Sequence, residues 1–598
     1  MTEKLSSSSR SQPPEAFVLR DVAWSRVFEF SQLFRAFRLA IEPANWLVAL
    51  LAIVCIYTAG RTLDGLWGPQ VLPGEISDYQ TMNAAHYRTY VLQAQDNRQQ
   101  LLAQVLDTYA GNLPATKIQA LSHNPQAAYN MLQNAFEKQF HRTVADSYQI
   151  SPMAADGTVI QPAIMRQHAA KMLLAQMRAV QHTAGRGIFD ALLRFEHRKF
   201  SDLISNTLGL VRVEPADSST DTEAKAPVWQ IHLGLAPQSI HRIWKSHTIA
   251  GCLANMFITA PCWLLTGAAP MQKRMHENTV TVFIRRAAYL LSVLIFLAIS
   301  LASIAFSGAF ICRYSALKLA GHHPESQEVI RFVRAHIGSF IKAPLLPLAT
   351  IFGTSLGFGA IAMLGAIPIL GEILIGLGFV IFLIGGFIIM LMVLGLVGGA
   401  SLIYPTLAVE GSDSFDAISR SFSYVYSCPW RMLLYSIITL IYGALTYIFL
   451  TLALFVLLYA VHGVAGWGMG FFGLTHGWYT GGGKLASIWA TPRLGQLIPP
   501  INWWAMNWSE YVGALAMYFW LFMLISLLGA YVISFWFSSN TILYMLIRYN
   551  VDGQPTSDIF VNGQTPSTES PRRSLLATPP PVPMAPDQSP ENPDQSSS

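Results

Sequence analysis

The chain alternates between long apolar runs without charge and shorter polar segments. Charged side chains are absent from 432–483 and from 511–547, and the stretch 343–409 contains only one, Glu372. A soluble fold cannot bury so much continuous apolar chain, whereas about 20 such residues suffice for one helix to cross a bilayer. The pattern therefore predicts an all-α polytopic membrane protein with about six transmembrane helices.

Each predicted span lies between charged or turn-forming residues. One Lys, Arg or Asp at the centre of a span would cost about 2.5–3.5 kcal/mol on an insertion scale, so the absence of charge is informative. The six predicted spans are 44–60, 287–311, 344–366, 373–403, 432–459 and 513–540. A seventh apolar run, 247–268, contains Asn255, Thr259, Pro261 and Thr266. We expect this run to be interfacial or re-entrant.

Basic residues indicate the orientation of the spans. The N-terminal segment 1–43 and the loop 313–342 both carry several Lys and Arg residues, and basic loops prefer the cytoplasm. Six spans place both segments and the C-terminus on that side, although the four basic residues of 273–286 then lie outside. We expect a multi-pass protein of the bacterial inner (cytoplasmic) membrane with both termini cytoplasmic.

Composition divides the chain into six parts. Within the cytoplasmic segment, 22–41 reads as an amphipathic helix that lies either at the headgroup boundary or on the protein's own spans. The part between the first two spans is a predicted extracytoplasmic, mainly helical soluble insert, long enough to bury its own core. The last part is Pro-rich and is predicted to be a disordered cytoplasmic tail. The parts are 1–43, the first span 44–60, the insert 61–245, the interfacial segment 246–286, a five-helix membrane domain 287–547 and the tail 548–598.

Charge and motifs exclude several functions. The net charge of +5 is small and no basic block indicates nucleic acid. The five cysteines show neither metal nor disulfide spacing, and we find no phosphate loop, nucleophile elbow, HExxH or dinucleotide fingerprint. The sequence thus predicts no enzyme, no cofactor and no metal site.

Three residues are candidates for a function within the membrane. Glu372 is the single acid of its apolar block, and an intramembrane carboxylate is a functional hypothesis by default, although a position at an outer turn explains it more simply. Trp503 and Trp504 belong to the Trp-rich loop 462–512. Tryptophan prefers the membrane interface, and an aromatic ligand site is the alternative interpretation.

The segment 404–431 predicts an interfacial elbow between two spans. We expect Asp413 to cap a short helix in which Asp416 and Arg420 form an i, i+4 pair. Pro429 ends this helix and Trp430 marks re-entry into the membrane.

Two further expectations concern the ends and the face of this elbow. Pro405 and Gly411 are expected to end the preceding span. One face of the short helix is predicted to be apolar, and it carries Phe415, Ile418, Phe422 and Tyr426.

The string EGSDSFDAISRSFSYVYSCPW, 410–430, resembles a signature in uncharacterised multi-pass bacterial membrane proteins. The stretches 34–40, 308–313 and 343–348 fit the same resemblance, which covers about 30–60 and 285–460. The chain departs from that pattern after 313, where relatives tend to carry an acidic pair. The resemblance implies a topology, and it implies no activity.

These observations favour a non-enzymatic structural or assembly component of the cell envelope. The alternative is a transporter or channel for an apolar or lipid-like solute, because the spans lack the acids and histidines of ion-coupled carriers. The expected partners are the lipid bilayer and proteins that bind the insert or the Pro-rich tail. The oligomeric state stays open.

Overall fold

The fold is all-α in the residues that the computed structural model describes, which are 29–134 with short gaps, 186–211, 249–266, 278–472 without 369, parts of 485–497, and 508–560. These residues contain no β-strand, and Val71 forms an isolated bridge with Arg186. Six of the described helices are long and apolar enough to cross a membrane. The predicted fold class, an all-α polytopic membrane protein, is confirmed.

The six spanning helices extend beyond the predicted runs. They are α3 (Pro43–Trp67), α14 (Thr279–Leu319), α15 (Ser326–Ala362), α17 (Phe379–Glu410), α19 (Pro429–Phe472) and α21 (Trp508–Asp552). The predicted run 373–403 is interrupted, because α16 (Leu370–Leu377) ends before Gly378 and α17 begins after it. The run 247–268 contributes only the shorter apolar helix Gly251–Thr266, as the six-span topology expects.

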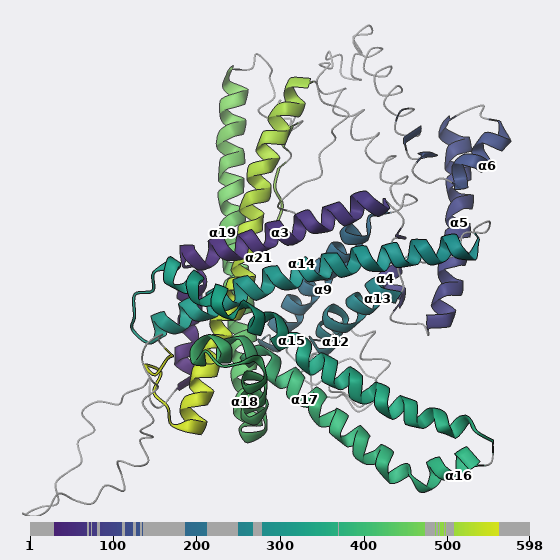
Figure 1. Cartoon of the computed structure of the whole chain (residues 1–598). Helices are drawn as coiled ribbons and strands as arrows, with labels where there is room; N and C mark the ends of the chain where they lie inside the picture. The colour runs from purple at the N-terminus through teal and green to yellow at the C-terminus, as the bar shows by residue number, and fades with distance from the viewer. Residues whose placement is uncertain are drawn as a thin grey trace, which may run out of the picture.

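The spans are arranged as three pairs that leave a common region in different directions (Figure 1). The pairs are α3 with α14, α15 with α17, and α19 with α21, and α14, α17 and α21 also pack against one another. The common region contains α18 (Ser414–Ser427), and α2 (Arg35–Ala40) packs against α21. The outer parts of the pairs expose apolar side chains such as Phe352 and Val397, which is the pattern of a lipid-facing surface.

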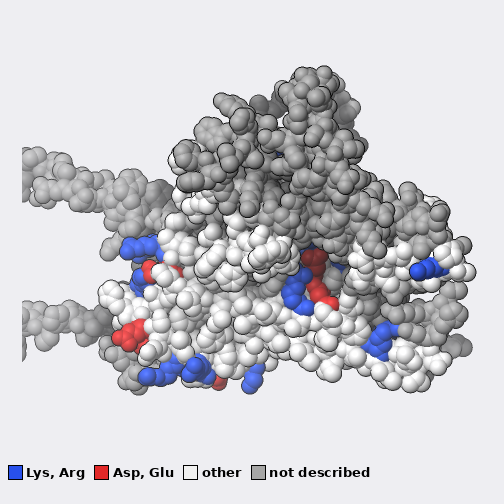
Figure 2. Space-filling model, turned by 90° about the horizontal axis from the view of Figure 1, so that it is seen from above, with Lys and Arg blue, Asp and Glu red and all other residues white. Residues whose placement is uncertain are grey.

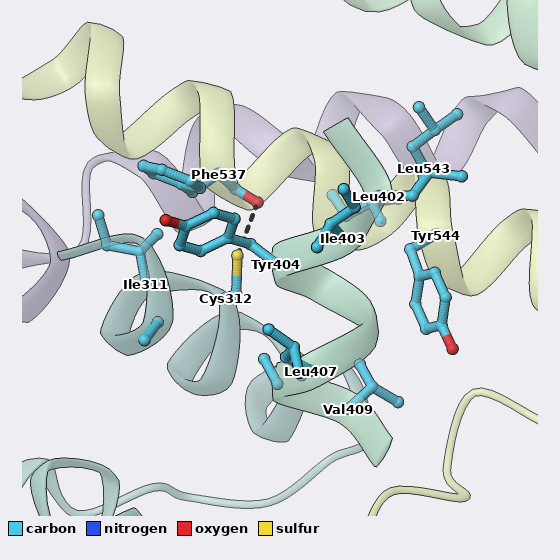
Figure 3. Close-up of a cluster of buried hydrophobic side chains, with 14 of the residues drawn as sticks. Ile311, Cys312, Leu402, Ile403, Tyr404, Leu407, Val409, Phe537, Leu543 and Tyr544 are labelled. Carbon is cyan, nitrogen blue, oxygen red and sulfur yellow. Dashed lines mark hydrogen bonds between the residues drawn. The ribbon is translucent and has the colours of Figure 1, made fainter. Parts of the chain in front are cut away.

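The main core lies where the three pairs meet. Tyr404 of α17 and Phe537 of α21 stack obliquely beside the Cys312 thiol of α14, which donates to the Phe537 carbonyl at 3.8 Å (Figure 3). A Cβ at Gly308 would lie 2.6 Å from the Phe537 ring. Small residues of this kind let membrane helices approach closely. Charged side chains form small groups separated by wide uncharged surface (Figure 2).

The amphipathic N-terminal segment packs on the protein's own spans where the structure describes it. Residues 22–28 lie outside the described residues, and η1 (Glu29–Phe34) leads into α2. Leu33 and Leu39 are buried against the main core, and the Tyr442 hydroxyl of α19 donates to the Phe34 carbonyl at 3.1 Å. Of the two predicted placements, the contacts favour packing on the spans.

The helices extend past the predicted span ends, and Pro405 does not end the preceding span as expected. The loop 313–342 is mostly helical, since α14 ends at Leu319 and α15 begins at Ser326. Helix α15 contains Pro344 and Pro347, and α17 continues through Pro405. Neighbouring helices and side chains can satisfy the backbone groups that proline leaves unpaired in a membrane helix.

The insert shares its core with the spans. Its helices are α4 (Glu75–Tyr79), α5 (Ala84–Ala110), α6 (Ala115–His123) and α9 (Ile188–Val211). The Asp64 carboxylate of α3 accepts hydrogen bonds from the backbone N–H groups of Phe189, at 2.7 Å, and Asp190, at 3.2 Å. It therefore caps α9 from a neighbouring helix. Phe200 of α9 contacts Tyr447 of α19 edge to face, with ring centroids 5.3 Å apart. The insert core expected within 61–245 is thus completed by α3, α14 and α19.

The Gly60→Ala variant is expected to destabilise the contact between α3 and α9. A Cβ at Gly60 would lie 2.3 Å from the buried Phe189 ring, and such overpacking costs about 1–3 kcal/mol. Thermal unfolding in detergent measures the effect. Gly65→Ala is the matched control, because nothing lies within 4 Å of its Cβ position and alanine favours the helix by up to about 1 kcal/mol. An equal midpoint for both variants would contradict this packing of α9.

Candidate functional site at the elbow

The elbow between α17 and α19 is set by glycine and proline. Helix α17 ends at Gly411, whose φ of 62° is left-handed and favours glycine. The Phe560 ring also lies 2.6 Å from the position of a Cβ there. Helix α18 ends before Pro429, as predicted, because Cys428 interrupts the helical backbone, and α19 begins at Pro429 itself. The chain therefore changes direction once before α18, at Gly411, and once after it, at Cys428.

The N-terminus of α18 differs in part from the prediction. Asp413 occupies the N-cap position with an extended backbone, and its carbonyl accepts the Ala417 N–H at 3.0 Å. Its side chain, however, forms no capping hydrogen bond. Asp416 lies in the first turn, close to the positive end of the helix dipole.

The predicted apolar face of α18 is not the face that packs on the rest of the protein. Phe415 is 74% exposed and Tyr426 is 45% exposed, although Phe422 fills the space over Gly395 and Gly399 of α17. The buried face consists of Ala417, Ile418, Ser421, Tyr424 and Val425. Ser421 and Tyr424 belong to this buried face because Thr406 of α17 and Asp552 of α21 bind their hydroxyl groups. Aromatic residues such as Phe415 and Trp430, which is 80% exposed, are typical of a membrane interface.

Arg420 bridges two acids of different burial. Its Nε lies 3.1 Å from an oxygen of Asp416, the predicted i, i+4 pair, and the Asp416 side chain is 45% exposed. Its Nη1 lies 2.7 Å from Oε2 of Glu410, whose side chain is only 8% exposed. The pair with Asp416 is screened by water, whereas the pair with Glu410 is largely desolvated.

Glu410 also binds the end of α21. The Tyr544 hydroxyl donates to Glu410 Oε1, and the Arg548 guanidinium lies 3.7 Å from the same oxygen. Tyr544 is fully buried and the Arg548 side chain is 9% exposed. The Tyr424 hydroxyl of α18 donates to Asp552. Burial, with the neighbouring Asp552 carboxylate, raises the pKa of Tyr424, so this phenol stays a neutral donor.

The chain after α21 folds back onto this site. We call 553–560 the strap. The Phe560 N–H donates to the Val409 carbonyl at 2.9 Å, and Arg548 donates to the Asp558 carbonyl at 2.6 Å. The buried Arg313 of α14 donates to the carbonyls of Ala408, at 2.8 Å, and Phe560, at 2.6 Å. The tail predicted for 548–598 therefore starts later, because α21 continues to Asp552 and the strap is packed.

The other predicted site residues do not join the elbow. Glu372 lies exposed in the first turn of α16, at the tip of the pair α15 and α17, where the simpler interpretation placed it. Trp503 and Trp504 lie outside the described residues, as do residues 561–598.

Sequence reasoning identified Asp416 and Arg420 and missed Arg313, Tyr544 and Arg548. Spacing can reveal a pair four residues apart, whereas Arg313 and Phe560 are 247 positions apart. One available signal is that Arg313 and Arg548 both lie where an apolar run ends.

The site is a closed network rather than a reaction centre. Its charged groups are paired with one another or with backbone carbonyls, and such pairing favours a single arrangement of helices. Oε2 of Glu410 and Nε of Arg548 are held by ion pairs alone and form no hydrogen bond to any described residue. In the described part of the chain, no group of three or more His, Cys, Asp or Glu side chains could hold a metal ion. The geometry fits a rigid joint between α14, α17, α18 and α21.

Comparisons with models of known families, with curated proteins and with solved structures found no match to this chain. The resemblance of 410–430 to uncharacterised bacterial membrane proteins stays a prediction.

Proposed function

We propose that the protein is a non-enzymatic structural or assembly component of the cell envelope that holds its insert and its C-terminal residues in a fixed relation. The observation that carries this proposal is the elbow network. Arg313, Glu410 and Arg548 join three spans to the strap, so residues 561–598 begin at a fixed point. At the other end of the spans, Asp64 caps an insert helix.

The proposed location is the bacterial inner membrane, with the elbow cytoplasmic and the insert outside. The basic residues of 1–43 and 313–342 support this orientation. Labelling with an impermeant maleimide tests it in a variant without native cysteines. Gln93→Cys in the insert is expected to react from outside, and Gln327→Cys only after permeabilisation. Both positions are exposed. Labelling of both from one side would exclude the topology.

A truncation after Phe560 tests the scaffold role, because it removes 561–598 and keeps the strap. Thermal stability in detergent is expected to be unchanged, while proteins cross-linked to the tail in intact cells are lost from the purified complex. A truncation after Asp552 is the control that also removes the strap. It is expected to lower the unfolding midpoint, since the Arg313 and Arg548 contacts disappear. A set of partners that is identical in the full chain and in the Phe560 truncation would contradict recruitment through the tail.

A further inference from the structure

One helix of the insert, α9, lies along the membrane spans. Its first turn packs on the end of α3 from which the insert begins, where the Asp64 carboxylate accepts the Phe189 N–H at 2.7 Å. Further along α9, the Phe200 ring contacts the Tyr447 ring of α19, with centroids 5.3 Å apart. Figure 1 shows α9 beside the spans and apart from α5 and α6. Helix α9 therefore runs from the insert end of the spans towards the common region.

The contacts with α19 show the level that α9 reaches. Leu203 of α9 packs with Leu440, which lies nine residues after Arg431, the last charged residue before the uncharged run. Nine residues of α-helix cover about 14 Å, so Leu440 lies near the middle of a hydrocarbon core about 30 Å thick. Because Leu203 contacts the span at this level, α9 enters the core.

The apolar segment after the insert packs on α9. It consists of α12 (Ile249–Ala254), the π-helical η2 (Asn255–Thr259) and α13 (Ala260–Thr266). The Thr259 hydroxyl donates to the Asn255 amide oxygen at 3.0 Å, and both side chains are buried. We call Leu253, Phe257 and Ile258, which are 37%, 70% and 50% exposed, the apolar surface. Polar groups inside and apolar groups outside are typical of a segment that faces lipid.

This segment and α9 run in opposite directions between the same two levels. At the deep level, the fully buried Cys252 of α12 shares a cluster with Leu203. At the insert end, the Leu264 carbonyl of α13 accepts the Tyr289 hydroxyl of α14 at 2.7 Å. The steps from Phe189 to Leu203 and from Cys252 to Leu264 correspond to about 21 and 18 Å of helix. The segment therefore returns to the side from which α9 starts.

The exposed side of α9 is charged instead of apolar. We call Arg194, whose side chain is 58% exposed, and the exposed His197 and Arg198 the charged surface. Arg198 lies nine residues beyond Phe189, about 14 Å of helix. Charged side chains at membrane depth face protein or a water-filled space, and these three are not covered by any described part of the chain. Water is thus the solvent that suits this surface.

We propose that α9 and the segment from α12 to α13 form a re-entrant pair, which enters the bilayer from the insert side with lipid on one surface and water on the other. The apolar surface binds the acyl chains of lipids, and the charged surface is hydrated from the insert side. A lipid occupant follows from the level of the pair, because the neighbouring span α19 exposes apolar side chains such as Leu445 there. The re-entrant interpretation of 247–268 thereby extends to a helix of the insert.

Spin labels on the full chain, reconstituted into phosphatidylcholine vesicles, test both surfaces. The labels are placed in a variant in which Cys55, Cys262 and Cys428 are replaced by serine, while the buried Cys252 and Cys312 are kept. Collisions with oxygen, which concentrates in hydrocarbon, are compared with collisions with a neutral nickel chelate, which stays in water.

A label on Phe257→Cys is expected to collide several-fold more with oxygen than with the chelate. Phe352→Cys is the lipid reference, because it is a 70% exposed position of the span α15, equal in exposure to Phe257. A label on Arg198→Cys is expected to give the opposite ratio, as is Gln93→Cys, the water reference on an exposed position of α5.

Two outcomes would overturn the proposal. A Phe257 label with the ratio of the Gln93 reference would mean that the apolar surface lies in water or outside the bilayer. An Arg198 label with the ratio of the Phe352 reference would remove the hydrated surface. If Phe257→Cys does not fold, Ile258→Cys on the same surface is expected to give the lipid ratio, and a water ratio there would overturn the proposal equally.

Discussion

The Glu410→Ala variant is expected to lose about 3–5 kcal/mol of stability, the usual effect of removing one partner from a buried ion pair. Arg548 is nearly buried beside Glu410, so its charge would lose its compensating carboxylate. The Tyr544 hydroxyl would lose its acceptor at the same time. Thermal and denaturant unfolding of the purified protein in detergent measure the loss as a lower midpoint.

Asp416→Asn provides the matched control for Glu410→Ala, because both acids contact Arg420. The Asp416 side chain is 45% exposed, and exposed ion pairs contribute about 0–1 kcal/mol. The two variants therefore separate the effect of burial from that of Arg420 itself. Equal, small losses in both would show that Glu410 is hydrated in the folded protein, and the rigid-joint interpretation would fail.

The Arg313→Met variant is expected to release the strap. Arg313 donates to the Ala408 and Phe560 carbonyls, and its guanidinium lies 4.2 Å from the Phe332 ring centroid. Methionine fills part of the volume and leaves both carbonyls without this donor. An unsatisfied buried group costs about 1–3 kcal/mol, so we expect a loss of about 2–6 kcal/mol for the two carbonyls together.

Hydrogen exchange at 553–560 reports on the strap directly. Protection of the Phe560 N–H, which is bonded to Val409, is expected to fall by one to two orders of magnitude in Arg313→Met, as a local opening of about 1.4–2.8 kcal/mol requires. Arg331→Met is the control, because Arg331 is an exposed arginine of the neighbouring α15. Unchanged protection in Arg313→Met would mean that other contacts hold the strap.

The i, i+4 pair at the elbow shows how far local reasoning reaches. Asp416 and Arg420 are neighbours on any helix, so their spacing alone predicts their contact. Nothing in that spacing indicates that Glu410 is the more deeply buried partner of Arg420. Glu410 reaches Arg420 because the chain turns at Gly411 and α18 packs against α17.

The buried face of α18 shows what a hydropathy pattern leaves open. An apolar stripe through Phe415 and Tyr426 does not tell a protein-facing side from a lipid-facing one, because in a membrane protein the lipid also solvates apolar side chains. The buried face contains Ser421 and Tyr424, because Thr406 and Asp552 bind their hydroxyl groups. Hydropathy cannot distinguish a side chain that faces lipid from one that faces protein.

By itself, the sequence determined the all-α membrane class and the approximate positions of six apolar spans, because a bilayer core excludes charge over a fixed length of helix. Only the tertiary structure decided which side chains meet. Arg313, Glu410 and Arg548 come from three helices far apart in sequence, and the Asp64 carboxylate of α3 accepts the Phe189 N–H of α9, 125 positions away. Contacts of this kind depend on how helices pack, and a one-dimensional pattern of polarity does not contain that information.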